Sequence, residues 1–168
     1  MRVLSIKNSI WTFIMDFVYL QYSGLKTKNI APFALKIILF MAQLLQLNSF
    51  SSENGNLTIL ENILPHDVKR LFYIYGAGGK IRGGHRHKAA WNALTCVAGE
   101  CKVYLHDGFR EQIFSLDSPT QCLVIEPGDW HQMYDFSENA ILLGISDENY
   151  DKDDYVFEQY EKLQLQTA

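Results

Sequence analysis

Histidine is the residue type best suited to proton transfer in this chain of 168 residues. His85 and His87 stand two positions apart in the run Arg-Gly-Gly-His-Arg-His-Lys at 82–88, and His131 follows a Pro-Gly turn at 127–128. A neutral imidazole accepts a proton near pH 7, and it also ligates divalent metals. If the three rings converge, the sequence predicts either a general base or a metal centre.

The run 82–88 is typical of a β-strand that carries a site. Alternate residues of a strand point to the same face, so His85 and His87 share one face and Arg86 takes the other. The glycines before them allow a tight turn or the close approach of a ligand. Arg82 precedes these glycines, where a guanidinium can bind a phosphate through two parallel hydrogen bonds. This segment therefore predicts an anionic substrate beside a base.

Short strands must position these residues, because most of the chain after Leu44 alternates β-type segments with turns. Clear turn signals are Asn54-Gly55, His106-Asp107-Gly108 and Pro127-Gly128. Many short strands without long helical patterns between them indicate an antiparallel sandwich or barrel. Only 151–164 has helical character, with two aspartates in its first turn, and we predict a short C-terminal helix there.

The first 43 residues differ from the remainder. Their apolar runs, 11–20 and 37–42, fall short of the roughly 20 apolar residues of a membrane span, and no secretory signal pattern is present. Three interpretations remain: a membrane-peripheral or partner-binding helix pair, an extra packing element, or translated sequence upstream of the real start. We favour the last, and assign 1–43 to an atypical apolar N-terminal extension outside the native fold and 44–168 to one domain.

Composition narrows the class of protein. The formal net charge is −4, which argues against binding to nucleic acid. Cys96, Cys101 and Cys122 are odd in number and lack C-x-x-C spacing, so we expect free, buried thiols. Free thiols are typical of a reducing compartment, and we expect a cytoplasmic protein without a membrane span.

The histidine segments resemble the two motifs of the cupin fold. These are an H-x-H strand, a glycine turn about a dozen residues later (here Gly99), and a return strand with a Pro-Gly turn and a histidine, here His131. The resemblance implies an all-β double-stranded β-helix, a jelly-roll barrel, with both strands lining one mouth. Metal-binding cupins of this kind carry a carboxylate four or five positions after the second histidine, where this chain has Trp91 and Asn92. We therefore expect no metal and no other cofactor.

A more specific resemblance rests on four segments in register. They resemble the WxcM-like family of dTDP-4-keto-6-deoxyhexose 3,4-ketoisomerases and lie at 82–88, 116–119, 130–137 and 150–155. The resemblance runs from about Leu44 to the C-terminus. It implies a homodimer that exchanges N-terminal strands and binds a dTDP-linked keto sugar. It also implies proton transfer from C3 to C4 through an enediol without metal or organic cofactor, with His85 as the base and His87 as a supporting or relaying group.

One position departs from this family, whose members often have Tyr-Tyr in the strand before the glycines. This chain has Phe72-Tyr73. Strand alternation places Phe72 on one face and Tyr73 on the other, so Tyr73, a catalytic candidate, needs a bulge to reach the site. The substrate-binding candidates, besides Arg82, are Arg70, His131, Trp91 and Tyr134.

Two rival functions from other classes stay open. A sugar-nucleotide-binding cupin without catalysis is favoured by Phe72. A metal-dependent cupin enzyme is favoured by the three histidines.

Overall fold

The structure, a computed structural model, describes residues 42–161. The predicted extension at 1–43 and the end of the predicted C-terminal helix lie outside the described residues, apart from Ala42 and Gln43. Ala42 is buried in the core and Gln43 begins the first strand, so the described fold already includes both. Within 42–161, no helix is long and apolar enough to cross a membrane.

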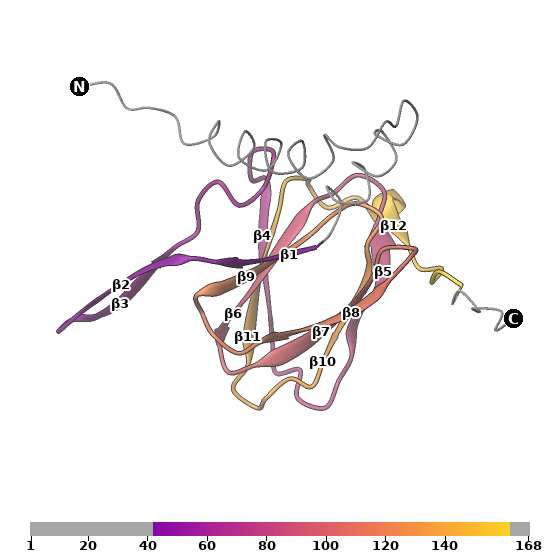
Figure 1. Cartoon of the computed structure of the whole chain (residues 1–168). Helices are drawn as coiled ribbons and strands as arrows, with labels where there is room; N and C mark the ends of the chain where they lie inside the picture. Colours follow the sequence, from indigo (N-terminus) through magenta and orange to yellow (C-terminus); the bar gives the residue numbers. More distant parts are fainter. Residues whose placement is uncertain (1–41, 162–168) are drawn as a thin grey trace, which may run out of the picture. The chain divides into compact units, whose positions relative to one another are not determined.

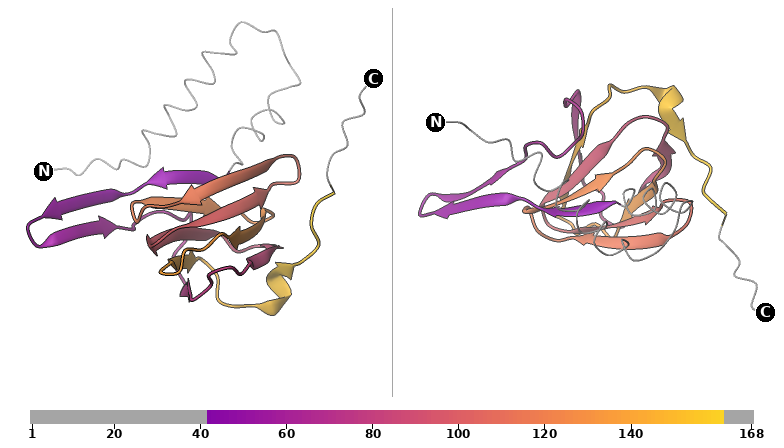
Figure 2. Two further views of the ribbon diagram at one scale, coloured as in Figure 1. Left: turned by 90° about the horizontal axis from the view of Figure 1, so that it is seen from below. Right: turned by 45° about the horizontal axis from the view of Figure 1, so that its top comes forward.

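Two antiparallel five-stranded sheets face each other, as Figure 1 shows, and this confirms the all-β prediction. The first sheet has the order β1 (Gln43–Gln46), β9 (Gln121–Ile125), β6 (Asn92–Ala98), β11 (Ile141–Ser146) and β4 (Arg70–Tyr75). The second has the order β12 (Tyr155–Val156), β5 (Arg82–His87), β10 (Trp130–Tyr134), β7 (Cys101–His106) and β8 (Glu111–Leu116). A hairpin of β2 (Asn48–Ser52) and β3 (Gly55–Ile59) extends away from the two sheets (Figure 2).

Apolar side chains fill the space between the sheets. Leu94, Val103, Leu105 and Leu142 are each at most 2% exposed and belong to one cluster that includes residues of both sheets. Burial of a side chain of this size stabilises the fold by about 1.5–3 kcal/mol. Strand β6 lies in the interior of its sheet and is buried from Asn92 to Cys96, so residues on both of its faces are inside the protein.

The three cysteines are free and buried, which confirms the prediction of unpaired thiols. Cys96 and Cys101 lie in the same apolar cluster as Leu94, and Cys122 lies in a second cluster. They pack as small apolar side chains.

The predicted C-terminal helix is wrong within the described residues. Lys152–Asp154 form a single 3₁₀ turn capped by Asp151, and Tyr155–Val156 then form β12, which pairs with β5. The acidic first turn is present, but the Asp154 carboxylate accepts hydrogen bonds from the backbone N–H groups of Lys88 and Ala89. These bonds fix the segment against β5, and a short isolated helix is too weak to compete with them.

Candidate active site

A bulge in β5 places its arginine and its histidines on one face. His131 of β10 lies opposite His85, but the next residue of β10 lies opposite Gly83, so β5 carries one extra residue, Gly84. Gly83 and Gly84 both have φ of +79°, and a Cβ on Gly83 would lie 2.9 Å from the His131 carbonyl oxygen. The extra residue reverses the alternation, so Arg82 lines the same pocket as His85.

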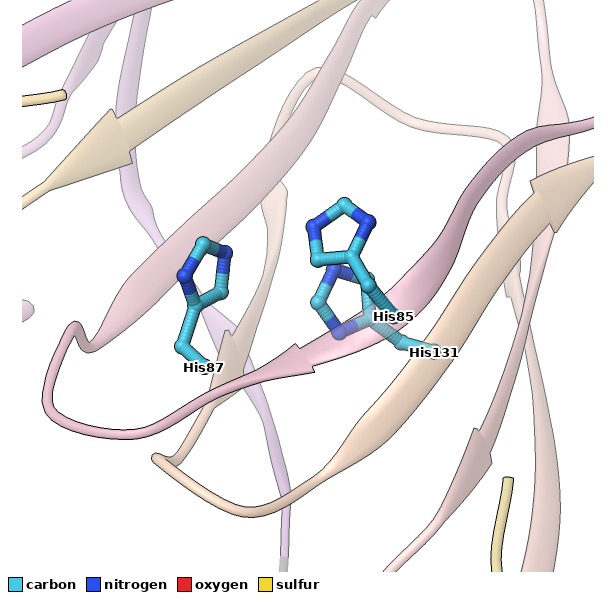
Figure 3. A group of neighbouring side chains, drawn as sticks. All are labelled: His85, His87 and His131. Carbon is cyan, nitrogen blue, oxygen red and sulfur yellow. The ribbon is translucent and has the colours of Figure 1, made fainter. Parts of the chain in front are cut away.

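The three histidines converge, as the sequence predicted. Figure 3 shows His85 and His87 on one strand and His131 on its neighbour. The ring centroid of His85 lies 5.0 Å from that of His87 and 4.9 Å from that of His131. One nitrogen of each ring lies within 4.8 Å of the others, and all three residues line one pocket of about 610 Å³.

Burial keeps these imidazoles neutral at cellular pH. Burial and the nearby His87 lower the pKa of His85 to about 4, and burial lowers the pKa of His131 to about 3. The pKa of His87 is also lowered by burial, against the opposing effect of Asp154. Neutral imidazoles can accept protons, so the cluster has the protonation state that a general base requires.

Asp154 orients His87 and was not singled out from the sequence. Its Oδ2 lies 2.7 Å from His87 Nδ1, and hydrogen bonds from Ala89 N–H and from His87 help to lower the pKa of its carboxyl. An ionised carboxylate only accepts hydrogen bonds, so His87 Nδ1 donates and the ring keeps its lone pair on Nε2. The signal in the sequence was the Tyr-Asp-x-x-Asp-Tyr run at 150–155, which the family resemblance included.

Two rows of residues on β4, β11 and β6 form the opposite wall of the pocket. Ser146 of β11 is paired with Arg70 on one side and with Asn92 on the other. Gly144 is paired in the same way with Phe72 and Leu94. A Cβ at Gly144 would clash with the Phe72 ring, so this glycine lets the ring lie across the wall. Arg70, Phe72, Asn92 and Leu94 all line the pocket.

The pocket is cationic although the chain is acidic. Arg70, Arg82 and Lys152 line it, whereas none of the described residues that line it is an aspartate or a glutamate. Aromatic rings border the same space: Phe72, Tyr150, Tyr155 and Phe157. The ring centroid of Tyr155 lies 4.6 Å from the ring centroids of both His85 and His87. Such a site suits an anionic ligand with a ring that can stack.

The four remaining candidates from the sequence differ in whether they line the pocket. Arg70, a substrate-binding candidate, lines the pocket. Tyr73 borders the pocket, but its side chain is 66% exposed and lies on the outer side of β4, as alternation predicted. Trp91 and Tyr134, both described, are not among the residues that line the pocket. The aromatic residues found there come instead from β4 and from the segment 150–157, of which 151–157 belonged to the predicted helix.

The two other cations of the 82–88 run hold the C-terminal segment. The Arg86 guanidinium lies 4.4 Å from the Tyr160 ring centroid and donates to the Glu158 carbonyl. Lys88 Nζ donates to the Asp153 carbonyl at 2.6 Å. Lys88 therefore stabilises the turn that carries Asp154, and Arg86 stabilises the segment after β12; neither lines the pocket.

Comparison with known proteins identifies relatives of known activity. Residues 41–166 match the family described as FdtA: WxcM-like, C-terminal. The chain is 36% identical over 117 residues to TDP-4-oxo-6-deoxy-alpha-D-glucose-3,4-oxoisomerase of Aneurinibacillus thermoaerophilus, which covers 68% of this chain and 84% of that protein.

Two solved structures share the fold closely. The first is the TDP-fucose-3,4-ketoisomerase WlaRA of Campylobacter jejuni, with 30% identity, a TM-score of 0.66, and coverage of 71% of this chain and 90% of that one. The second is a mutant of the 3,4-ketoisomerase QdtA of Thermoanaerobacterium thermosaccharolyticum in complex with TDP-4-keto-6-deoxyglucose. It has 33% identity, a TM-score of 0.67, and coverage of 70% and 87%.

Proposed function

Since the chain belongs to the FdtA family of WxcM-like C-terminal domains, we propose that it is a sugar-nucleotide 3,4-ketoisomerase with the cupin fold. It converts a TDP-linked 4-keto-6-deoxyhexose into the 3-keto isomer. The observation that carries this proposal is the group of three neutral imidazoles in one cationic pocket. Relatives named as TDP-sugar 3,4-ketoisomerases support the same substrate class.

In the proposed reaction, His85 removes the C3 proton. The neighbouring C4 carbonyl acidifies this proton, because the electrons left on C3 delocalise onto O4 as an enediolate. O4 gains a proton to give the enediol, O3 loses its hydroxyl proton, and C4 receives a proton, so the product differs from the substrate only in the positions of its hydrogens. His85 returns the proton to C4, and His87, oriented by Asp154, exchanges the protons on O3 and O4.

The cations and aromatic rings of the pocket bind the nucleotide. Arg82 binds the diphosphate, because charge-assisted hydrogen bonds to phosphate are among the strongest that proteins form. Lys152, on the 3₁₀ turn, adds a second positive charge to the same pocket. Tyr150 and Phe157, each 70% exposed, offer stacking surfaces to the base.

The partner of this chain is a second copy in the cytoplasm. Within residues 42–161, strand β4 lies at the edge of its sheet and exposes three large side chains, Leu71, Tyr73 and Tyr75, and the β2–β3 hairpin exposes Phe50 and Leu57. Exposed apolar surface beside an unpaired strand edge supports pairing between copies. The three free thiols support a reducing, cytoplasmic location.

Incubation of the purified protein with TDP-4-keto-6-deoxyglucose tests this function. We expect a 3-keto product that NMR distinguishes from the substrate. Tight binding of TDP and of the keto sugar without any product would favour the rival function, a binding protein without catalysis.

The pH profile should report the lowered histidine pKa. A base with its pKa near 4 remains neutral when the pH falls from about 8 to about 5.5, so kcat/KM should stay constant over this range. A histidine with an ordinary pKa of about 6.5 would lose about tenfold in kcat/KM between pH 8 and pH 5.5. Circular dichroism at each pH verifies that the fold persists. A decline of kcat/KM centred near pH 6.5 would contradict the neutral, buried base.

A metal-dependent cupin enzyme remains a second candidate because of one observation. His87 and His131 each use Nδ1 in a hydrogen bond, to Asp154 and to the Asp129 carbonyl, and this leaves Nε2 of each ring as a possible ligand atom. Such second partners are also common for metal-bound histidines. The set of potential ligands within the described residues contains three imidazoles and no carboxylate.

Chelation separates the two candidates. We expect treatment with EDTA and dialysis to leave turnover of TDP-4-keto-6-deoxyglucose unchanged, because the proposed steps need only protein side chains. Loss of activity that added Zn²⁺, Mn²⁺ or Fe²⁺ restores would establish the metal-dependent alternative. The metal content of the untreated protein, measured by mass spectrometry, is the control.

A further inference from the structure

Asn92 is a buried amide that has no hydrogen-bond partner within residues 42–161. The residue is 3% exposed, and neither its Nδ2 nor its Oδ1 has a partner among the residues that the structure describes. A buried polar group without a partner destabilises a fold, so each such group requires an explanation. Asn92 lines the pocket, and an amide that faces a ligand site can gain its partners from the ligand.

Arg70 has the same property on the same wall. Its Nε is buried and has no hydrogen-bond partner within 42–161. Asn92 and Arg70 flank Ser146 in one row of the sheet, so their backbones are about two strand spacings, roughly 10 Å, apart. The charge of Arg70 contributes to the lowered pKa of His87, so the guanidinium lies near the histidines. The unpaired donors and the unpaired acceptor therefore border the space in which the proposed chemistry occurs.

We propose that Asn92 is a specificity-determining residue that binds the α-hydroxy ketone of the sugar. A primary amide presents a donor beside an acceptor. This pair matches the adjacent carbonyl and hydroxyl at C4 and C3: Nδ2 donates to the carbonyl oxygen, and Oδ1 accepts from the hydroxyl. Arg70 Nε donates to the oxygen that becomes negative in the enediolate. This inference rests on the proposed function and assigns to Asn92 the reacting part of the sugar, whereas the nucleotide is bound elsewhere in the pocket.

The assignment has two consequences that a structural role would not have. Replacement of Asn92 by leucine removes a buried amide that has no partner among the described residues, so stability should be unchanged or increased. The same replacement removes two hydrogen bonds to the sugar, so kcat/KM should fall by about 10- to 100-fold. The affinity for TDP, which lacks the sugar, should not change.

The experiment compares Asn92→Leu with Thr95→Val. Thr95 is on the same strand and is 1% exposed, but it does not line the pocket. We measure kcat/KM for TDP-4-keto-6-deoxyglucose, the Kd of TDP, and the unfolding midpoint of the free proteins. For Thr95→Val we expect kcat/KM to equal that of wild type. Asn92→Asp is a second variant of almost the same shape that loses the donor, and its kcat/KM should also fall.

Several outcomes would overturn the role of Asn92. These are an unchanged kcat/KM in Asn92→Leu, a parallel loss of TDP affinity, or a lower unfolding midpoint. If wild type binds TDP-4-keto-6-deoxyglucose but does not convert it, the proposed function fails and the role of Asn92 is still tested. The gain in affinity that the sugar gives over TDP should then shrink in Asn92→Leu, and an undiminished gain would refute the assignment.

Discussion

Replacement of His85 by asparagine should lower turnover by about 10²- to 10⁴-fold, the usual contribution of a general base. Asparagine keeps a polar side chain in the pocket but cannot accept a proton from carbon at neutral pH. The variant should still bind TDP, because the proposed phosphate ligand, Arg82, is unchanged. The measurement is kcat with saturating TDP-4-keto-6-deoxyglucose, together with a calorimetric titration of TDP.

Two further variants are needed to interpret the turnover of His85→Asn: a control at an exposed histidine and a variant of the second histidine in the pocket. His66→Asn changes a histidine whose side chain is 68% exposed and which does not line the pocket, so its turnover should equal that of wild type. His87→Asn should cost less than His85→Asn if His87 only relays protons between oxygens. Full turnover by His85→Asn would remove His85 as the base, and a larger loss in His87→Asn would transfer that role to the ring that Asp154 orients.

Replacement of Arg82 by alanine should weaken nucleotide-sugar binding by about 10- to 150-fold. This range corresponds to about 1.5–3 kcal/mol for a hydrogen bond between charged groups. Arg82 is exposed to solvent, so salt should screen its charge, and we expect the difference in affinity between wild type and Arg82→Ala to narrow as ionic strength rises.

Arg110→Ala is the matched control for Arg82. Arg110 is an exposed arginine beside Asp107, and it does not line the pocket. Titration of TDP by calorimetry should give the wild-type Kd for Arg110→Ala and a weaker one for Arg82→Ala. Indistinguishable curves for wild type and Arg82→Ala would dismiss Arg82 as the phosphate ligand.

Local patterns were sufficient to predict most of the strands of the two sheets and the face that the first two histidines share. The spacing of His85 and His87 determines a common face through strand alternation alone. The same rule correctly placed Phe72 inside and Tyr73 outside. These features depend only on residues that are close in sequence, which explains why they were predictable without a structure.

Contacts between distant segments were not predictable in this way. Asp154 meets His87 across 67 positions, and no periodicity encodes that pairing. The segment 151–156 looked helical because of its composition, whereas its conformation depends on pairing with β5. Asn92 was weighed only as a position that lacks a metal ligand, since its unpaired amide becomes evident only when the neighbouring strands are in place.

The most direct test of the proposed isomerase is the reaction in D₂O, with the C3 proton of TDP-4-keto-6-deoxyglucose followed by NMR. With wild type, we expect the C3 signal to disappear as a 3-keto product forms, with deuterium at C4, or with the original hydrogen there if His85 carries the proton across without exchange. With His85→Asn, the C3 signal should persist although the variant binds TDP. A wild-type sample in which the C3 signal remains and no 3-keto product forms would contradict the proposed proton transfer and the isomerase function with it.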